Sequence, residues 1–235
     1  MREPVRGLAA DLDWRRWLSA PTPATVGSSF DHAINLGTGD ELLTLVCADG
    51  RPAPGTLITS AAAFPRMPAG AVVHSSPGWV RIGGLAVDTS SCVGYSCQAV
   101  PPDGPAPTID PVRLREVLDL VGESGSFRLD PTPLALAKVL RVRLLDAAQR
   151  YQRGLVLLLR GSPGLAAESV AGLVGLGIGL TPSGDDYLVG SLAGLWHLGT
   201  AQASLAALGS AVRARATTTT SVGRHFLTAA AEGRF

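Results

Sequence analysis

Val100-Pro-Pro-Asp-Gly-Pro-Ala-Pro107 separates two halves of the chain that follow different sequence patterns. Its four prolines within eight residues make a stiff, extended connection. Short β-like segments precede it, and apolar residues with the period of an α-helix follow it. We therefore predict an α+β protein with a β-rich domain over residues 1–100, a proline-rich linker over residues 101–109 and a helical domain over residues 110–235.

The half before the prolines consists of short segments rich in β-branched or apolar residues, separated by turn sequences. Gly83-Gly84 between two such segments predicts a two-residue hairpin. The even spacing of the segments predicts a small antiparallel barrel or sandwich, with an initial helix over residues 12–18 packed on its edge. The predicted strands cover residues 25–36, 42–47, 56–59, 71–74, 79–82 and 85–88.

The half after the prolines has helical periodicity. Leu136, Val139 and Leu140 begin an apolar stripe at spacings of three and four residues, the pattern of an amphipathic helix. The predicted helices start at residue 110 and continue over residues 134–159, 166–174, 182–198, 205–213 and 221–231.

Gly175-Leu-Gly-Ile-Gly-Leu-Thr-Pro-Ser-Gly-Asp-Asp186 is the stretch that points to a binding site. We expect Thr181 to cap a helix that opens with Pro182, so that a flexible loop presents unpaired backbone N–H groups to an anion. The stretch has no lysine after its glycines and no third glycine at the dinucleotide spacing, so both familiar nucleotide motifs are excluded. A tight packing turn is the alternative. The predicted substrate-binding residues here are Gly177, Gly179, Thr181, Ser183 and Gly184.

Asp185 and Asp186 are the predicted catalytic residues. As a structural alternative, the two carboxylates complement the helix dipole. The functional alternatives are a Mg²⁺ site that bridges to a phosphate, and a general base with an orienting partner. Adjacent residues of a helix point about 100° apart. We therefore expect one aspartate to be functional and the other structural.

Two other segments offer polar groups. Arg213-Ala-Arg-Ala-Thr-Thr-Thr-Thr-Ser221 combines arginines with hydroxyls, so we predict that Arg215 and Ser221 bind the substrate, against the alternative of a solvated helix end. Asn35 is a further candidate, because an inward-pointing asparagine on a strand over residues 25–36 needs partners. The histidines show no metal-ligand spacing, and no metal site is predicted from them.

Composition excludes several classes of protein. The hydrophobic residues make up 46% and the charged residues 17%, which indicates a folded globular chain. The net charge of +1 gives no reason to expect nucleic acid as a partner. The three cysteines match no zinc motif, and we expect reduced thiols. Without a signal sequence or a run long enough to span a membrane, we expect a cytoplasmic protein with no membrane partner.

The stretch from Gly175 to Asp186 resembles the signature of a bacterial family that includes AllH, a subunit of oxamate carbamoyltransferase. Weaker similarities follow the same order along the chain, in residues 30–36, in the hairpin over residues 82–88 and in residues 220–235. The resemblance covers most of the chain from about residue 25, but only the glycine stretch is specific. Position 178 departs from it with isoleucine where proline is expected, and family members continue through further helices after Phe235.

The resemblance implies transfer of a carbamoyl group between oxamate and phosphate in nitrogen metabolism, on a small anionic substrate and beside partner subunits. It assigns no catalytic residues. Apart from the Mg²⁺ site considered for the two aspartates, we expect no required cofactor. Backbone N–H groups of the glycine stretch would supply the donors that a developing oxyanion needs. The alternatives are a non-catalytic subunit that binds a metabolite or scaffolds the complex, and an enzyme that uses the same fold on another small amide or carboxylate.

Overall fold

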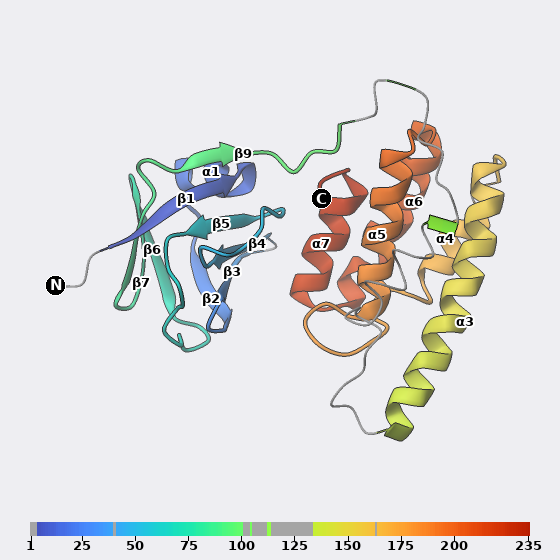
Figure 1. Cartoon of the computed structure of the whole chain (residues 1–235), viewed down its shortest axis with the longest axis horizontal. Coiled ribbons are helices and arrows are strands. Elements are labelled where there is room, and N and C mark those ends of the chain that lie inside the picture. Colours follow the sequence, from blue (N-terminus) through green and yellow to red (C-terminus); the bar gives the residue numbers. More distant parts are fainter. Residues whose placement is uncertain (1–3, 40, 101–103, 105–111, 114–133, 163) are drawn as a thin grey trace. The chain divides into compact units, whose positions relative to one another are not determined.

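The computed structural model of the chain describes residues 4–39, 41–100, 104, 112–113, 134–162 and 164–235 (Figure 1). A β-sheet is followed by helices, which confirms the α+β fold class. The chain divides into two compact units, one reaching Gln98 and including Arg234, the other running from Ala99 to Gly233 and including Phe235. The predicted linker lies outside the described residues, apart from Gly104, and so does the helix predicted from residue 110, apart from Val112 and Arg113.

The first unit is a closed β-barrel. Its strands pair in the order β5-β4-β3-β2-β6-β7-β8-β1, and pairing of β1 with β5 closes the ring, while β9 adds to β1 outside it. The barrel, one of the two architectures predicted, is therefore confirmed. The strands are β1 Val5–Asp11, β2 Ala24–Ser29, β3 Ala33–Thr38, β4 Glu41–Val46, β5 Thr56–Thr59, β6 Val72–Ser76, β7 Trp79–Ile82, β8 Leu85–Asp88 and β9 Val93–Tyr95.

The barrel is filled by side chains of its own strands and of one helix. Leu36, Leu43 and Val80 are fully buried members of this core. Helix α1 (Leu12–Ser19), predicted over residues 12–18, adds Trp14 and Trp17, whose rings meet edge to face with centroids 5.6 Å apart. The helix therefore contributes to the core itself.

Three details of the barrel differ from the prediction. The strand predicted over residues 25–36 is two strands, β2 and β3, joined by a turn. Strands β1 and β9 were not predicted. The barrel is also not wholly antiparallel, since β4–β5, β1–β8 and β1–β9 are parallel pairs. Parallel pairing needs a connection longer than a hairpin turn. Residues 47–55 make this connection between β4 and β5, and β1 pairs with strands that follow it much later in the chain.

The second unit is a helical bundle with a separate core (Figure 1). Tyr151 of α3, Leu188 and Leu192 of α5, Leu208 of α6 and Leu227 of α7 are all fully buried in it. No helix in the described part of the chain has the length and apolar character needed to span a membrane. The helices are α3 Leu134–Leu159, α4 Gly164–Val170, α5 Ser183–His197, α6 Gln202–Arg215 and α7 Ser221–Ala231, with a 3₁₀ turn, η2, over Ala216–Thr218.

Candidate functional site

The glycine stretch forms the loop that connects α4 to α5 in the second unit. We call residues 175–184 the glycine loop. It folds back against the start of α5, because the Gly184 N–H donates to the Leu176 carbonyl oxygen at 2.8 Å. Gly177 has φ = 138°, and a Cβ there would lie 2.5 Å from the Ser183 nitrogen. Only glycine can take this conformation at this close approach.

Helix α5 begins one residue later than predicted. Pro182 is its N-cap residue, no side chain caps the helix, and Thr181 lies outside it. The physical reason is the fold of the loop. A capping hydroxyl of Thr181 would have to accept a hydrogen bond from Ser183 or Gly184, and the Gly184 N–H is already bound by the Leu176 carbonyl. The expected threonine cap is therefore wrong.

Asp185 is held inside the second unit. Its side chain is only 2% exposed, and its carboxylate accepts hydrogen bonds from the Gly175 N–H at 2.7 Å and from the Thr219 hydroxyl at 2.5 Å. A Cβ on Gly223 would lie 2.3 Å from the same carboxylate, so α7 packs directly against it. These contacts tie the glycine loop to the start of α7, which is a structural role.

Asp186 has a different environment. It is half-buried, and within the described parts of the chain its carboxylate makes no hydrogen bond or ion pair. Burial and, secondly, the neighbouring charge of Asp185 raise the pKa of Asp186 above its usual range. Of the two predicted catalytic residues, Asp186 is thus the one whose carboxylate is available to a ligand.

The segment before α7 meets the glycine loop through two threonines. Thr219 binds Asp185 as described, while the Thr220 hydroxyl donates to the Leu180 carbonyl oxygen and accepts the Gly223 N–H at 2.9 Å as the N-cap of α7. Both threonines belong to the hydroxyl run noted in the sequence, although Ser221 was the residue of that run predicted to bind the substrate. Gly223, a glycine inside the helix that follows the run, was the sequence signal for close packing here.

The remaining predicted site residues are placed less closely. Ser221 is the exposed first residue of α7, and Arg215 is exposed at the end of α6 with no side-chain partner among the described residues. Nothing lies within 4 Å of a Cβ added to Gly179. Asn35 belongs to the first unit, where its amide donates to Ser28 and accepts from Thr44, both at 2.9 Å. Its assignment to the substrate site stays a prediction.

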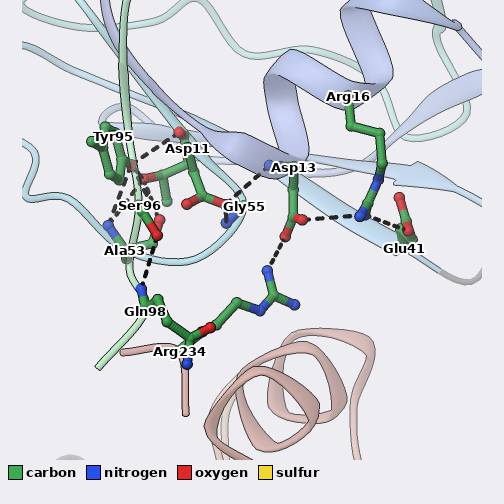
Figure 2. A network of polar contacts seen from close by, with 11 residues as sticks. Asp11, Asp13, Arg16, Glu41, Ala53, Gly55, Tyr95, Ser96, Gln98 and Arg234 are labelled. Atoms are coloured by element: carbon green, nitrogen blue, oxygen red, sulfur yellow. Dashed lines mark hydrogen bonds and ion pairs between the residues drawn. The ribbon is translucent and has the colours of Figure 1, made fainter. Parts of the chain in front are cut away.

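The first unit holds a polar network of its own, shown in Figure 2. The buried Asp11 carboxylate accepts from the N–H groups of Asp13 and Gly55, at 3.2 and 3.1 Å. Asp13 in turn accepts from Arg16 and from Arg234. Each of these carboxylates already has a partner, so the network stabilises the start of α1.

The cysteines add no reactive group to the barrel. All three are free, and burial raises the pKa of the Cys47, Cys92 and Cys97 thiols, that of Cys97 to about 11 with a further contribution from Asp11. Thiols with raised pKa are poor nucleophiles at neutral pH. Among the described residues, no three His, Cys, Asp or Glu side chains gather closely enough to hold a metal ion.

Comparison with known proteins gives two matches to family models. The AllH family N-terminal domain matches residues 6–94, most of the barrel. The family described as oxamate carbamoyltransferase subunit AllH matches residues 173–235, from the glycine loop through α7. The searches of curated proteins and of solved structures each found no match. The matched regions contain every predicted site residue.

Proposed function

The chain belongs to the AllH family, and on that premise we propose that it is a subunit of a carbamoyltransferase complex. In this proposal the start of α5 binds a small anionic amide or carboxylate of the oxamate and carbamoyl phosphate class. The family description names an oxamate carbamoyltransferase subunit, which supports both the reaction and the need for partner subunits.

The observation that carries this proposal is the environment of Asp186. A half-buried carboxylate with a raised pKa and no hydrogen-bond partner in the described structure is costly unless something else uses it. Oxamate and carbamoyl groups carry N–H donors, which a carboxylate accepts. We assign Asp186 to this amide, and the exposed Arg215 guanidinium to the anionic end of the ligand.

Asp185 has a supporting role in the same proposal. Its carboxylate fixes the glycine loop against Thr219, and so it holds the backbone of residues 177–184 beside Asp186. A rigidly held loop can aim backbone N–H groups at the oxygen that becomes charged during carbamoyl transfer. Asp185 is thus a positioning residue, and Asp186 is the residue in contact with substrate.

The experiment that tests this function compares Asp186→Asn with Asp49→Asn, an exposed aspartate in a turn of the other unit. We expect Asp186→Asn to weaken oxamate binding by about 10- to 100-fold, the usual value of a hydrogen bond to a charged group. Asp49→Asn should bind as the parent does. Equal binding by all three proteins would contradict the assignment of Asp186.

The competing function is a non-catalytic subunit that binds the metabolite for a partner. Incubating the purified chain alone with carbamoyl phosphate and oxamate tests this alternative, because turnover by the chain alone would contradict a subunit that only binds. Repeating the assay with and without Mg²⁺ shows whether a divalent cation acts at the adjacent carboxylates.

A further inference from the structure

A second site, separate from the start of α5, lies between α3 and α4. Two cavities of about 290 and 310 Å³ adjoin there and share Arg150 and Gly172 in their walls. We call them together the α3–α4 groove. One cavity extends to Leu157 and Glu168, and the other to Arg143 and Leu176. The proposed function uses none of the side chains in this groove.

Arginines of α3 dominate the polar lining. Arg143 and Arg150 are seven residues apart, which places them on the same side of the helix about 10 Å apart along its axis, and Arg153 follows on the neighbouring turn. Guanidinium groups on long side chains can converge on one anion across that distance. The lining therefore favours a negatively charged ligand.

The acidic groups of the groove leave an excess of positive charge. Asp146 accepts from Arg150 at 2.5 Å, and this ion pair orients the Arg150 guanidinium toward Gly172, where its Nη2 would lie 3.9 Å from an added Cβ. Glu168 lines only the cavity at the other end. Arg143 has no ion-pair or hydrogen-bond partner for its side chain among the described residues. Its guanidinium is thus unpaired in the described structure, while Arg153 has only a hydrogen bond from its Nε to the Gln149 carbonyl oxygen.

The rest of the groove combines an apolar part with the charged side chains of Arg153 and Glu168. Leu157 and Gly154 line the cavity away from Arg143, and Gly172 leaves open the space that a side chain would take beside Ala147 and Arg150. A bare inorganic anion would leave this part unfilled. The ligand that fits has an anionic head and a compact apolar body.

We propose that the α3–α4 groove binds an organic anion, with its phosphate or carboxylate head on Arg143 and Arg150 and its apolar body toward Leu157. This site goes beyond the proposed function, because it uses neither Asp186 nor the backbone N–H groups of residues 177–184, although Leu176 of the glycine loop lines one of its cavities. Head groups of both kinds share the same chemistry for a pair of guanidinium groups. The apolar body selects between ligands that carry them.

The test is calorimetric titration of the full chain with phenyl phosphate, benzoate and inorganic phosphate. We expect saturable binding of at least one phenyl compound, and weaker binding of inorganic phosphate. Arg143→Ala should weaken the binding by tenfold or more. Gly172→Leu should abolish it by filling the groove, and its circular dichroism spectrum should match that of the parent. Arg141→Ala, an exposed α3 arginine outside both cavities, should change nothing.

Three results would overturn the proposal. The first is no binding of either phenyl compound at millimolar concentration, and the second is unchanged binding by Arg143→Ala. The third involves Asp186→Asn, which should bind the phenyl compounds as the parent does. If this variant loses them together with oxamate, there is one site at α5 and no separate groove site. Loss of oxamate binding alone supports two sites.

Discussion

The two adjacent aspartates have opposite effects on stability. Asp185 satisfies the Gly175 N–H and the Thr219 hydroxyl in a buried position. Asp185→Ala leaves both donors without an acceptor, so we expect the free energy of unfolding to fall by about 1–3 kcal/mol. Urea denaturation measures the loss. The control, Asp49→Ala in an exposed turn, should have nearly the free energy of unfolding of the parent. An equally small change in both variants would contradict the structural role of Asp185.

Asp186 should make stability depend on pH. Its pKa is raised in the folded protein by burial and by Asp185, so the folded state favours the protonated carboxyl. The resulting stabilisation is present below the ordinary pKa of aspartate and is lost as the pH rises through the raised pKa. Asp186→Asn, which is neutral at every pH, should therefore unfold at higher urea concentration than the parent at neutral pH. This advantage should shrink as the solution is acidified through that interval.

Stability and oxamate binding, measured together on Asp186→Asn, distinguish a functional aspartate from a structural one. If Asp186→Asn gains stability at neutral pH and loses oxamate binding, the carboxylate is retained at a cost in stability for the sake of the ligand. A gain in stability with unchanged binding would leave Asp186 as a strained but idle residue. A loss of stability at neutral pH would contradict the raised pKa.

At the scale of elements, helix α5 contains glycines of two kinds. A Cβ on Gly184 would lie 2.0 Å from the Leu173 carbonyl oxygen, whereas nothing lies within 4 Å of a Cβ added to Gly190. Gly190→Ala should therefore stabilise the chain by about 0.5–1 kcal/mol through helix propensity. Gly184→Ala should destabilise the chain, because the added Cβ would force the backbone at Leu173 to move. Thermal unfolding of both variants measures these effects. Melting temperatures that shift in the same direction in both variants would contradict the difference between the two glycines.

Gly190 also bears on assembly. Small residues at four-residue spacing, such as Gly190 and Gly194, let another helix approach closely, and both are exposed in the described structure. If a partner subunit packs there, Gly190→Ala should stabilise the isolated chain and weaken the complex.

Elements set by local sequence were predicted well. The strands at residues 56–59, 79–82 and 85–88 and the helices at residues 134–159 and 221–231 have the predicted bounds. Strand β1 was missed because Val5-Arg-Gly-Leu-Ala-Ala-Asp11 has weak β propensity, and its conformation depends on distant partners in β5, β8 and β9.

The candidate site, too, could be predicted only where its residues are neighbours in the sequence. The glycines and aspartates were found because they are contiguous. Thr219, which donates to Asp185, was not found in this way, because it lies 34 residues away and meets Asp185 only when α7 packs against α5. Helix geometry led us to expect different roles for Asp185 and Asp186, but the assignment of these roles that we propose depends on that packing. The α3–α4 groove was invisible in the sequence for the same reason.

At the scale of the whole molecule, closure of the barrel depends on β1, the first strand of the described chain, pairing with both β5 and β8. Such nonlocal pairing cannot be read from strand spacing, and it explains why the sequence left barrel and sandwich as alternatives. It also removes the free sheet edge between β5 and β8, where an open sheet would be prone to aggregate.

The closed barrel predicts that the first unit folds by itself. Residues 4–98 contain all of its strands, helix α1 and the core around Trp14, Leu43 and Val80. Such a core supports independent folding at this size. The isolated segment should show a β-type circular dichroism spectrum, blue-shifted tryptophan emission from the buried Trp14, and one cooperative thermal transition. Leu43→Ala should lower its stability by about 2–5 kcal/mol.

Among the described residues of this unit, Arg234 is the one that the segment lacks. Without it, Asp13 keeps its hydrogen bond from Arg16 at 3.1 Å and loses the bond from Arg234. Since Asp13 remains partnered, we expect the segment to fold with a modestly lower melting temperature, and Arg234→Ala in the full chain should produce a similar shift in the barrel's transition. A segment with the spectrum of a disordered chain would show that the barrel needs the rest of the protein to close.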